Sequence, residues 1–255
     1  MQINWIGLYT IVRREVARMM RVPIQVFVAP WISALLFIFI FGFVVGGRIA
    51  AIGGHRYLEF VLPGILLMNI VNASFLQSSS AIYFARFLHF IEETLVSPLS
   101  YVEMIVGSLT TVVVRSLLTA LGILVMGVAF GATHFISLLG FLFWVVAVSS
   151  IFGLLGLIIG LWAKSFEQLN VLTVFFITPL SMVGGVFNTV GMLPGWLRFL
   201  DYGNPFFYFT NGLRGAMLGV DETPPGLGIG LTLILLAVMG VTVWRLYAKG
   251  YGLRE

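Results

Sequence analysis

Charged residues are scarce in this chain, and cysteine is absent. Asp, Glu, Lys and Arg together make up 9% of the 255 residues, whereas an ordinary soluble domain carries about 25%. So few charges cannot cover the surface of a water-soluble protein of this size, which excludes soluble enzymes, nucleic-acid-binding modules and disordered chains. The absence of cysteine excludes disulfide frameworks, thiolate metal sites and cysteine nucleophiles.

Apolar residues dominate the composition instead. Hydrophobic residues make up 60% of the sequence and Phe alone occurs 23 times, while the mean hydropathy is +1.06. These values are typical of a protein that crosses a membrane several times. In that setting the net charge of +4 indicates loops that face anionic membrane lipids, and no nucleic-acid partner is expected.

Six membrane spans fit between the charged residues. A helix needs about 20 apolar residues to cross a hydrocarbon core of roughly 30 Å, and the uncharged runs are long enough. The stretch from Glu103 to Lys164 holds one charge, Arg115, and has room for two spans that separate near 131–134. We therefore expect an all-α polytopic membrane protein, with one transmembrane domain over residues 1–255. Its spans are expected at 24–46, 60–85, 101–130, 137–163, 168–190 and 225–244.

The distribution of Lys and Arg predicts the orientation. With both termini in the cytoplasm, the cytoplasmic side carries nine of these residues and the outer side carries four. This asymmetry obeys the positive-inside rule, and the reverse topology violates it. The nine are Arg13, Arg14, Arg18, Arg21, Arg86, Lys164, Arg245, Lys249 and Arg254, and the four are Arg48, Arg56, Arg198 and Arg214.

Residues 1–21 form an amphipathic pattern. They lack the apolar core and the small-residue cleavage site of a signal peptide. Their apolar residues recur at helical spacing on one face, whereas Arg14, Arg18 and Arg21 lie on another. This pattern is typical of a helix that lies in the membrane interface; the alternative is a positively charged flank that happens to be helical. The apolar face comprises Trp5, Leu8, Val12, Val16 and Met19.

Catalytic, metal and nucleotide sites are not visible in the sequence. No Asp or Glu lies in the middle of a predicted span, where an ion-coupled carrier usually needs one. His55, His89 and His134 fall in three different loops. Ala163 precedes Lys164, where a phosphate-binding Walker A loop needs Gly. We therefore expect no catalytic residue, cofactor, metal or nucleotide hydrolysis in this chain, so that energy comes from a partner or transport is passive.

Arg115 is the one charge inside a predicted span. If its helix begins near Tyr101, Arg115 lies about 21 Å along it at about 1.5 Å per residue. An arginine so deep in the membrane should face protein, water or an anion. Two roles stay open: a structural arginine bonded to the carbonyl groups of a neighbouring helix, or a residue of the gate or substrate pathway.

The segment 86–98, after the second span, is short and charged. Its apolar residues share a helical face, and its two adjacent acids, Glu92 and Glu93, project elsewhere. Such a helix can pass force from a soluble partner into the membrane, whereas the simpler interpretation is a solvated turn. The apolar face comprises Phe87, Ile91 and Leu95.

Two local signals make this segment rigid. Pro98 ends the helix, because a proline disfavours helical geometry at the residue before it. Ser100 and Glu103 then form a capping-box pattern that starts the next span. The sequence therefore predicts a charged cytoplasmic helix held tightly between two spans.

The segment 191–222, between the fifth and sixth spans, is apolar but repeatedly broken by Gly and Pro. Asn204 can cap a helix whose first residue is Pro205, and the stretch from there to Leu218 is too short to span a membrane. We expect outer re-entrant half-helices that enter the outer leaflet and return. The alternative is a surface loop anchored by aromatic residues such as Tyr202.

Over essentially its full length, the chain resembles the ABC-2 family of ABC-transporter permeases, in particular the bacterial branch of daunorubicin-resistance and nodulation-factor exporters. The likeness includes the amphipathic N-terminal helix and the six spans. It is most specific in the E-E-x-L-x-x-P-x-S pattern of residues 92–100. It is looser at 184–187 and from Asn204 and Pro205 to Leu213 and Arg214.

The resemblance implies a function and partners. It makes 1–21 a connecting helix, 86–98 a coupling helix that docks on a separate ATP-binding-cassette ATPase, and 191–222 the outer re-entrant helices. It implies two permease chains, expected as a homodimer, with two ATPase copies in a bacterial inner membrane, exporting drugs, lipids or glycans. The implied coupling residues are Phe87, Ile91, Glu92, Glu93, Leu95 and Pro98, and the candidates for gate or substrate pathway are Arg115, Asn204 and Pro205.

The leading hypothesis is therefore an export permease driven by a partner ATPase. An ATP-independent channel or facilitator would explain the absence of intramembrane carboxylates equally well, but it would not explain the rigid acidic loop. An intramembrane enzyme is disfavoured, because no cluster of His, Asp or Ser is expected at one depth.

Overall fold

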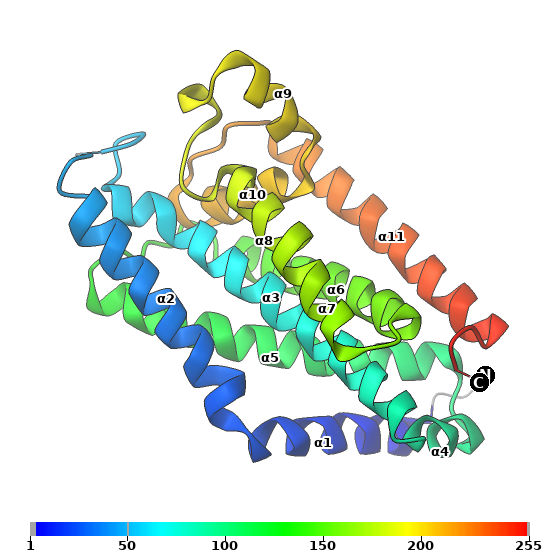
Figure 1. Ribbon diagram of the computed structural model, residues 1–255. Helices are drawn as coiled ribbons and strands as arrows, with labels where there is room; N and C mark the ends of the chain where they lie inside the picture. The colour runs from blue at the N-terminus through cyan, green and yellow to red at the C-terminus, as the bar shows by residue number, and fades with distance from the viewer. Residues whose placement is uncertain (1–3, 50, 254–255) are drawn as a thin grey trace.

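The computed structural model describes residues 4–49 and 51–253. Every regular element in that part of the chain is a helix, and the one extended pairing there is an isolated bridge between Ile52 and His55. Figure 1 shows the helices gathered into a bundle, with α4 at one end and α9 at the other. The all-α class expected from the sequence is confirmed.

Within the described residues, six helical stretches are long and apolar enough to cross a membrane, as the sequence predicts. The first, Ile24–Val45, has α2 (Ala29–Phe39) at its centre. The fifth, Phe166–Val186, begins with α7 (Phe166–Leu172) and continues through α8 (Thr178–Ser181). The other four are α3 (Tyr57–Phe87), α5 (Tyr101–Ala129), α6 (Leu138–Trp162) and α11 (Pro225–Lys249).

The central helix of the bundle is α3, which is buried along most of its length, whereas the first and last spans are largely exposed. α6 lies close against α3, because two of its glycines leave room. A Cβ atom on Gly156 would lie 2.6 Å from the carbonyl oxygen of Phe75, and one on Gly160 would lie 2.7 Å from that of Ser79. Close contact of this kind holds helices together in lipid, where no hydrophobic driving force acts between them.

The first helix, α1 (Trp5–Arg21), lies along the first half of α5 (Figure 1). Leu8 and Ile11 fill the space above Gly107 of α5, and Met19 is buried further along. Trp5, which the sequence places on the same apolar face, is instead exposed. The face predicted for α1 is therefore used against α5 over most of its length, and its location in the membrane interface stays a prediction.

Two short helices, α9 (Gly195–Gly203) and α10 (Pro205–Leu218), lie between the fifth and sixth spans. The predicted cap is confirmed: the side-chain oxygen of Asn204 accepts a hydrogen bond from the backbone N–H of Phe206 at 3.1 Å. The amide nitrogen of Asn204 donates to the carbonyl of Leu180 at 2.7 Å, which ties this turn to the fifth span. α10 is largely buried against α3, α6 and α11.

Candidate functional site

α4 (Phe90–Val96) is a short helix that two residues, Leu88 and His89, separate from α3. His89 has a φ of 58°, the only positive value outside glycine in residues 4–49 and 51–253. A left-handed backbone at such a residue costs about 1–2 kcal/mol, so the packing on both sides must hold it. The helix predicted over 86–98 is therefore in two pieces, because Arg86 and Phe87 end α3 and α4 begins only at Phe90.

This break between α3 and α4 changes which side chains of residues 86–98 face the solvent. Glu92 and Glu93 are exposed, and so is Pro98. Ile91 is turned inward with 7% of its surface exposed, and Leu95 is half-buried. The exposed apolar residues beside the acids are Phe87, Leu88, Phe90 and Val96.

The structure thus divides the predicted coupling residues between two faces. Phe87 and the two acids face outward, whereas Ile91 is buried against other parts of the chain and is not accessible to a partner. Sequence reasoning missed Phe90 and Val96 because it carried one helical register across His89. No signal in the sequence marks a left-handed histidine, although histidine is among the residues that tolerate this conformation.

Ile91 anchors the inner side of α4 in a hydrophobic cluster. Because protein interiors are close-packed, a displacement of this side chain must move its neighbours. The other members of the cluster come from α3, α5, α6 and α11 and from Leu253 beyond α11, so the cluster links α4 to four spans. They are Ile82, Met104, Ile105, Leu154, Leu157, Leu161, Val243, Tyr247 and Leu253.

A second junction joins the starts of α1 and α5. The predicted capping box is confirmed, because the carboxylate of Glu103 accepts from the backbone N–H of Ser100 at 2.6 Å while the Ser100 hydroxyl accepts from that of Glu103 at 3.3 Å. The other oxygen of Glu103 accepts from the backbone N–H of Asn4 at 2.6 Å. One carboxylate therefore ties both helix starts together beside α4.

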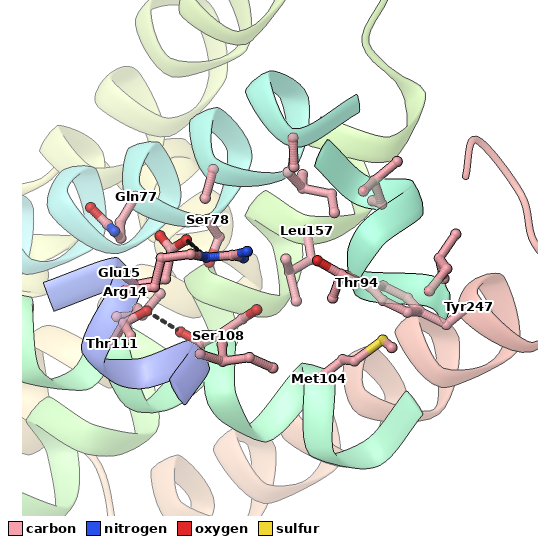
Figure 2. Close-up of a pocket in the computed structure, with 17 residues that line it drawn as sticks. Arg14, Glu15, Gln77, Ser78, Thr94, Met104, Ser108, Thr111, Leu157 and Tyr247 are labelled. Carbon is pink, nitrogen blue, oxygen red and sulfur yellow. Dashed lines mark hydrogen bonds and ion pairs between the residues drawn. The ribbon is translucent and has the colours of Figure 1, made fainter. Parts of the chain in front are cut away.

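A cavity of about 70 Å³ lies behind α4. Figure 2 shows Arg14 and Glu15 reaching into it from α1, near Gln77 and Ser78 of α3, with Tyr247 of α11 on the far side. The rest of the lining is mostly apolar. The apolar lining residues are Ile11, Ala81, Ile82, Ala85, Ile91, Leu95, Met104, Val112 and Leu157.

Arg115 lies beside this cavity, buried between α5 and α3. Its guanidinium donates to the side-chain oxygen of Gln77 at 2.7 Å. No carboxylate in the described part of the chain lies within ion-pair distance of it, and Arg18 of α1 is close enough for the two positive charges to repel. Arg115 therefore faces protein, as its depth requires, but its charge is not neutralised.

At the opposite end of the bundle, the fifth span stops at a glycine pair. Gly184 and Gly185 leave helical geometry, and Gly185 has a φ of 75°. The carbonyl groups that this break frees are taken up by α10. Thr210 donates to the carbonyl of Gly184 at 2.8 Å, and Arg214 donates to that of Gly185 at 2.7 Å.

Arg214 is fully buried at this break, and both terminal nitrogens of its guanidinium have partners, whereas its Nε has none in the described part of the chain. Besides Gly185 it binds Glu222 at 3.0 Å, and its guanidinium carbon lies 3.7 Å from the ring centre of Phe60. Burial lowers the pKa of Arg214 to about 10, against the opposing effect of the Glu222 carboxylate. The arginine therefore stays charged near neutral pH.

Residues 7–218 match the ABC-2 type transporter family. The chain belongs to this family. The ABC-2 resemblance stated from the sequence is thereby confirmed, and the match runs from α1 to the end of α10. With its six spans, this ABC-2 permease is a multi-pass membrane protein and a subunit of a membrane transporter.

Relatives of this ABC-2 permease match along nearly their whole length. The inner membrane transport permease YadH of Escherichia coli (strain K12) is 30% identical over 255 residues, which is 100% of both chains. Nodulation protein J of Rhizobium meliloti (strain 1021) is 24% identical over 228 residues, covering 89% of this chain and 86% of the relative. Nodulation protein J of Rhizobium leguminosarum bv. viciae is 22% identical over 239 residues, covering 92% and 90%.

Asp201 is a further residue of this permease that sequence reasoning missed. It lies in α9, is fully buried, and neither of its carboxylate oxygens has a hydrogen-bond partner in the described part of the chain. Burial raises the pKa of Asp201 to about 6, and the nearby charge of Glu222 adds to the shift. The sequence around it gave little indication of burial, because an acid between Leu200 and Tyr202 is as typical of a surface loop as of a buried site.

Proposed function

We propose that the chain is the permease subunit of an ATP-binding-cassette exporter in a bacterial inner membrane. It moves an amphipathic or lipid-like substrate, of the drug, lipid or glycan class, out of the cell. Two identical permease chains work with two copies of a separate ATPase subunit, and both termini lie in the cytoplasm. The family membership and the positive-inside distribution of Lys and Arg support this assignment.

The observation that carries the proposal is the two-sided character of α4. Its outer side exposes Glu92 and Glu93 next to apolar residues, which suits a soluble partner with an apolar groove and basic or hydrogen-bonding groups. Its inner side is fixed by Ile91 in a cluster drawn from four spans. A push on α4 by an ATPase is therefore delivered to α3, α5, α6 and α11 together.

Transport follows if the two ends of the bundle respond to that push. Closure of the ATPase pair on ATP moves α4 and rocks the two permease chains between an inward-open and an outward-open arrangement. Asn204 and Pro205 hold the turn between α9 and α10 against the fifth span, so they serve as the outer gate. Arg115 lines the inner part of the pathway, beside the cavity behind α4.

The double substitution Glu92→Gln, Glu93→Gln tests the proposal. We expect normal membrane insertion, because both residues are exposed outside the spans, but reduced co-purification of the partner ATPase, or ATP hydrolysis without export. Loss of one partner from a desolvated charge pair costs about 2–5 kcal/mol, whereas loss of a rim charge costs much less. Asp221→Asn is the control, because Asp221 is an exposed acid between α10 and α11, away from α4.

Two results would count against the proposal. If the double variant keeps wild-type ATPase association and export, docking does not use the acids. If no ATPase associates with the wild-type permease and its transport proceeds without ATP, the chain is a passive channel or facilitator instead.

A further inference from the structure

Three arginines and one acid meet where α1 crosses α3 and α5. Glu15 pairs with Arg18 at 2.6 Å and more loosely with Arg14 at 3.8 Å. Arg115 adds a third positive charge that no carboxylate in the described residues neutralises. The cluster therefore carries two positive charges in excess. The charge of Arg115 is buried in the bundle, where an uncompensated charge is costly, whereas the side chains of Arg14 and Arg18 are 53% and 41% exposed.

The same place holds buried hydrogen-bond donors without acceptors. Because Arg115 occupies the oxygen of the Gln77 amide, the NH₂ group of that amide must face the other way, and it has no partner. The hydroxyl of Ser78 and the Nε of Arg115 are also unpartnered. All three residues are more than nine-tenths buried: Arg115 is 7%, Gln77 4% and Ser78 1% exposed. Each such donor costs about 1–3 kcal/mol if it stays unsatisfied.

Unsatisfied donors and excess positive charge call for the same kind of ligand, an anion with several acceptor oxygens. Gln77, Ser78 and Arg14 line the cavity behind α4 (Figure 2). Glu15 lines it as well, and its carboxylate is paired with Arg18. We propose that this cavity binds the phosphate-bearing headgroup of an amphipath. Arg115 acts as a positioning residue that fixes the Gln77 amide, and the apolar lining accepts the first carbons of the tail.

This inference deepens the proposed function, because it gives the exporter's pathway a chemical preference. Two sources can supply the headgroup: a transported substrate that carries a phosphate, or a phospholipid that stays bound while the transporter works. The volume of about 70 Å³ suits a headgroup and not a whole lipid, so in either case the tail leaves between helices.

Binding is tested on the purified permease alone, with dodecyl phosphate as the probe in the neutral detergent dodecyl maltoside. The decisive variant is Gln77→Glu, which places a counter-charge against Arg115. It should fold with at least the wild-type yield and melting temperature, yet bind dodecyl phosphate roughly tenfold or more weakly, since it loses a donor and repels the anion. Arg14→Gln should also weaken binding. Arg13→Gln, an exposed neighbour outside the cavity lining, should leave it unchanged.

Equal affinity in wild type and Gln77→Glu, or no saturable binding by the wild type, overturns the site. Because no ATPase is present in this assay, the result is independent of the proposed function. If the permease binds the probe but never associates with an ATPase, the site is supported and the exporter assignment is wrong. If the permease is a coupled exporter that does not bind the probe, the assignment is supported and the site is wrong.

A second measurement separates the two sources. If the headgroup belongs to a transported substrate, dodecyl phosphate should stimulate ATP hydrolysis by the wild-type complex in phosphatidylcholine vesicles, and Gln77→Glu should not respond. If it belongs to a resident lipid, phosphatidylglycerol should co-purify with the wild type at a fixed ratio and be lost from Gln77→Glu, without stimulation by the probe. Either result supports the site, and the absence of both overturns it.

Discussion

Two buried arginines differ in the partners of their guanidinium groups. Arg214 at the α9 end has a carboxylate, a backbone carbonyl and an aromatic face around its guanidinium. Arg115 at the α4 side has one neutral amide. The Nε of each arginine lacks a partner in the described residues, but the charge of Arg214 is neutralised by Glu222 and that of Arg115 is not. Arg214 is therefore interpreted as a structural residue. The contrast makes different outcomes of substitution testable.

Replacing Arg214 should damage folding. Arg214→Gln removes the positive partner of Glu222, whose carboxylate keeps the backbone N–H of Val190, and frees the carbonyl of Gly185. Breaking a buried charge pair from one side costs about 3–5 kcal/mol. We expect a lower melting temperature and a lower folded yield in detergent, measured by fluorescence-detected size exclusion after heating. Arg245→Gln, an exposed arginine on α11, should change neither. A stable Arg214→Gln protein would show that the break at Gly184 and Gly185 is held by other contacts.

Asp201 predicts a dependence of stability on pH. Its pKa is raised from 3.8 to about 6 in the folded chain, so the protonated form favours folding and stability falls as the pH rises through this window. Asp201→Asn removes the titration. We expect the variant to melt at a higher temperature than the wild type above pH 6, with the difference shrinking to zero toward pH 3.8. Parallel melting curves across that range for the two proteins would contradict the assignment.

Contacts between residues close in the sequence could be predicted from local patterns, whereas contacts between distant residues could not. The cap at Asn204 and the capping box of Ser100 and Glu103 could be predicted, because each depends on residues at most three apart. Arg214 was counted among the loop charges, because its partners lie on α3, on α10's own loop and at the fifth-span break. Contacts between distant segments leave no trace in the spacing of one sequence.

Among the elements, α4 depends on the backbone at His89. His89→Gly should keep or raise stability, because glycine adopts a φ of 58° without strain. His89→Ile should cost about 1–3 kcal/mol and tilt α4 relative to Ile91. We expect the isoleucine variant to hydrolyse more ATP for each substrate moved, with the glycine variant near wild type. Indistinguishable ratios in the two variants would mean that the angle of α4 does not matter for coupling.

The contact of α6 with α3 depends on glycine. Gly156→Ala would place a Cβ 2.6 Å from the carbonyl of Phe75, which forces the two helices apart. We expect a clear loss of thermal stability. Gly240→Ala on α11, where nothing lies within 4 Å of an added Cβ, should instead stabilise the helix by up to about 1 kcal/mol. Equal melting temperatures for the two variants would remove glycine packing as the reason for the close approach.

Spans were the easiest elements to predict, because length and charge alone define them. The ends of the spans were harder to predict. α3 begins at Tyr57, before the predicted residue 60, and α11 continues to Lys249, beyond the predicted residue 244, because a helix can extend past the hydrocarbon core of the membrane. The break before α4 was missed because it depends on one residue held left-handed by its surroundings.

At the scale of the whole molecule, the absence of cysteine makes the proposed topology easy to test. Glu93→Cys and Gly195→Cys each create one thiol at an exposed position near opposite ends of the bundle. We expect a membrane-impermeant maleimide to label Gly195→Cys in intact cells and Glu93→Cys only in inside-out vesicles. Labelling of Glu93→Cys in intact cells would show that the orientation is the reverse of the one proposed, and that α4 does not dock on a cytoplasmic ATPase.

The central position of α3 also bears on how the chain is made. Its small polar residues, Ser78 and Ser79 among them, are covered by α6, yet α6 begins at Leu138, after the 50 residues numbered 88–137. At about 5–20 residues per second, a ribosome needs roughly 3–10 s to supply them. During that interval α3 waits with its hydroxyls facing lipid or the insertion machinery. A chain cut short before α6 should therefore stay with the translocon or be degraded, although it already holds three complete spans.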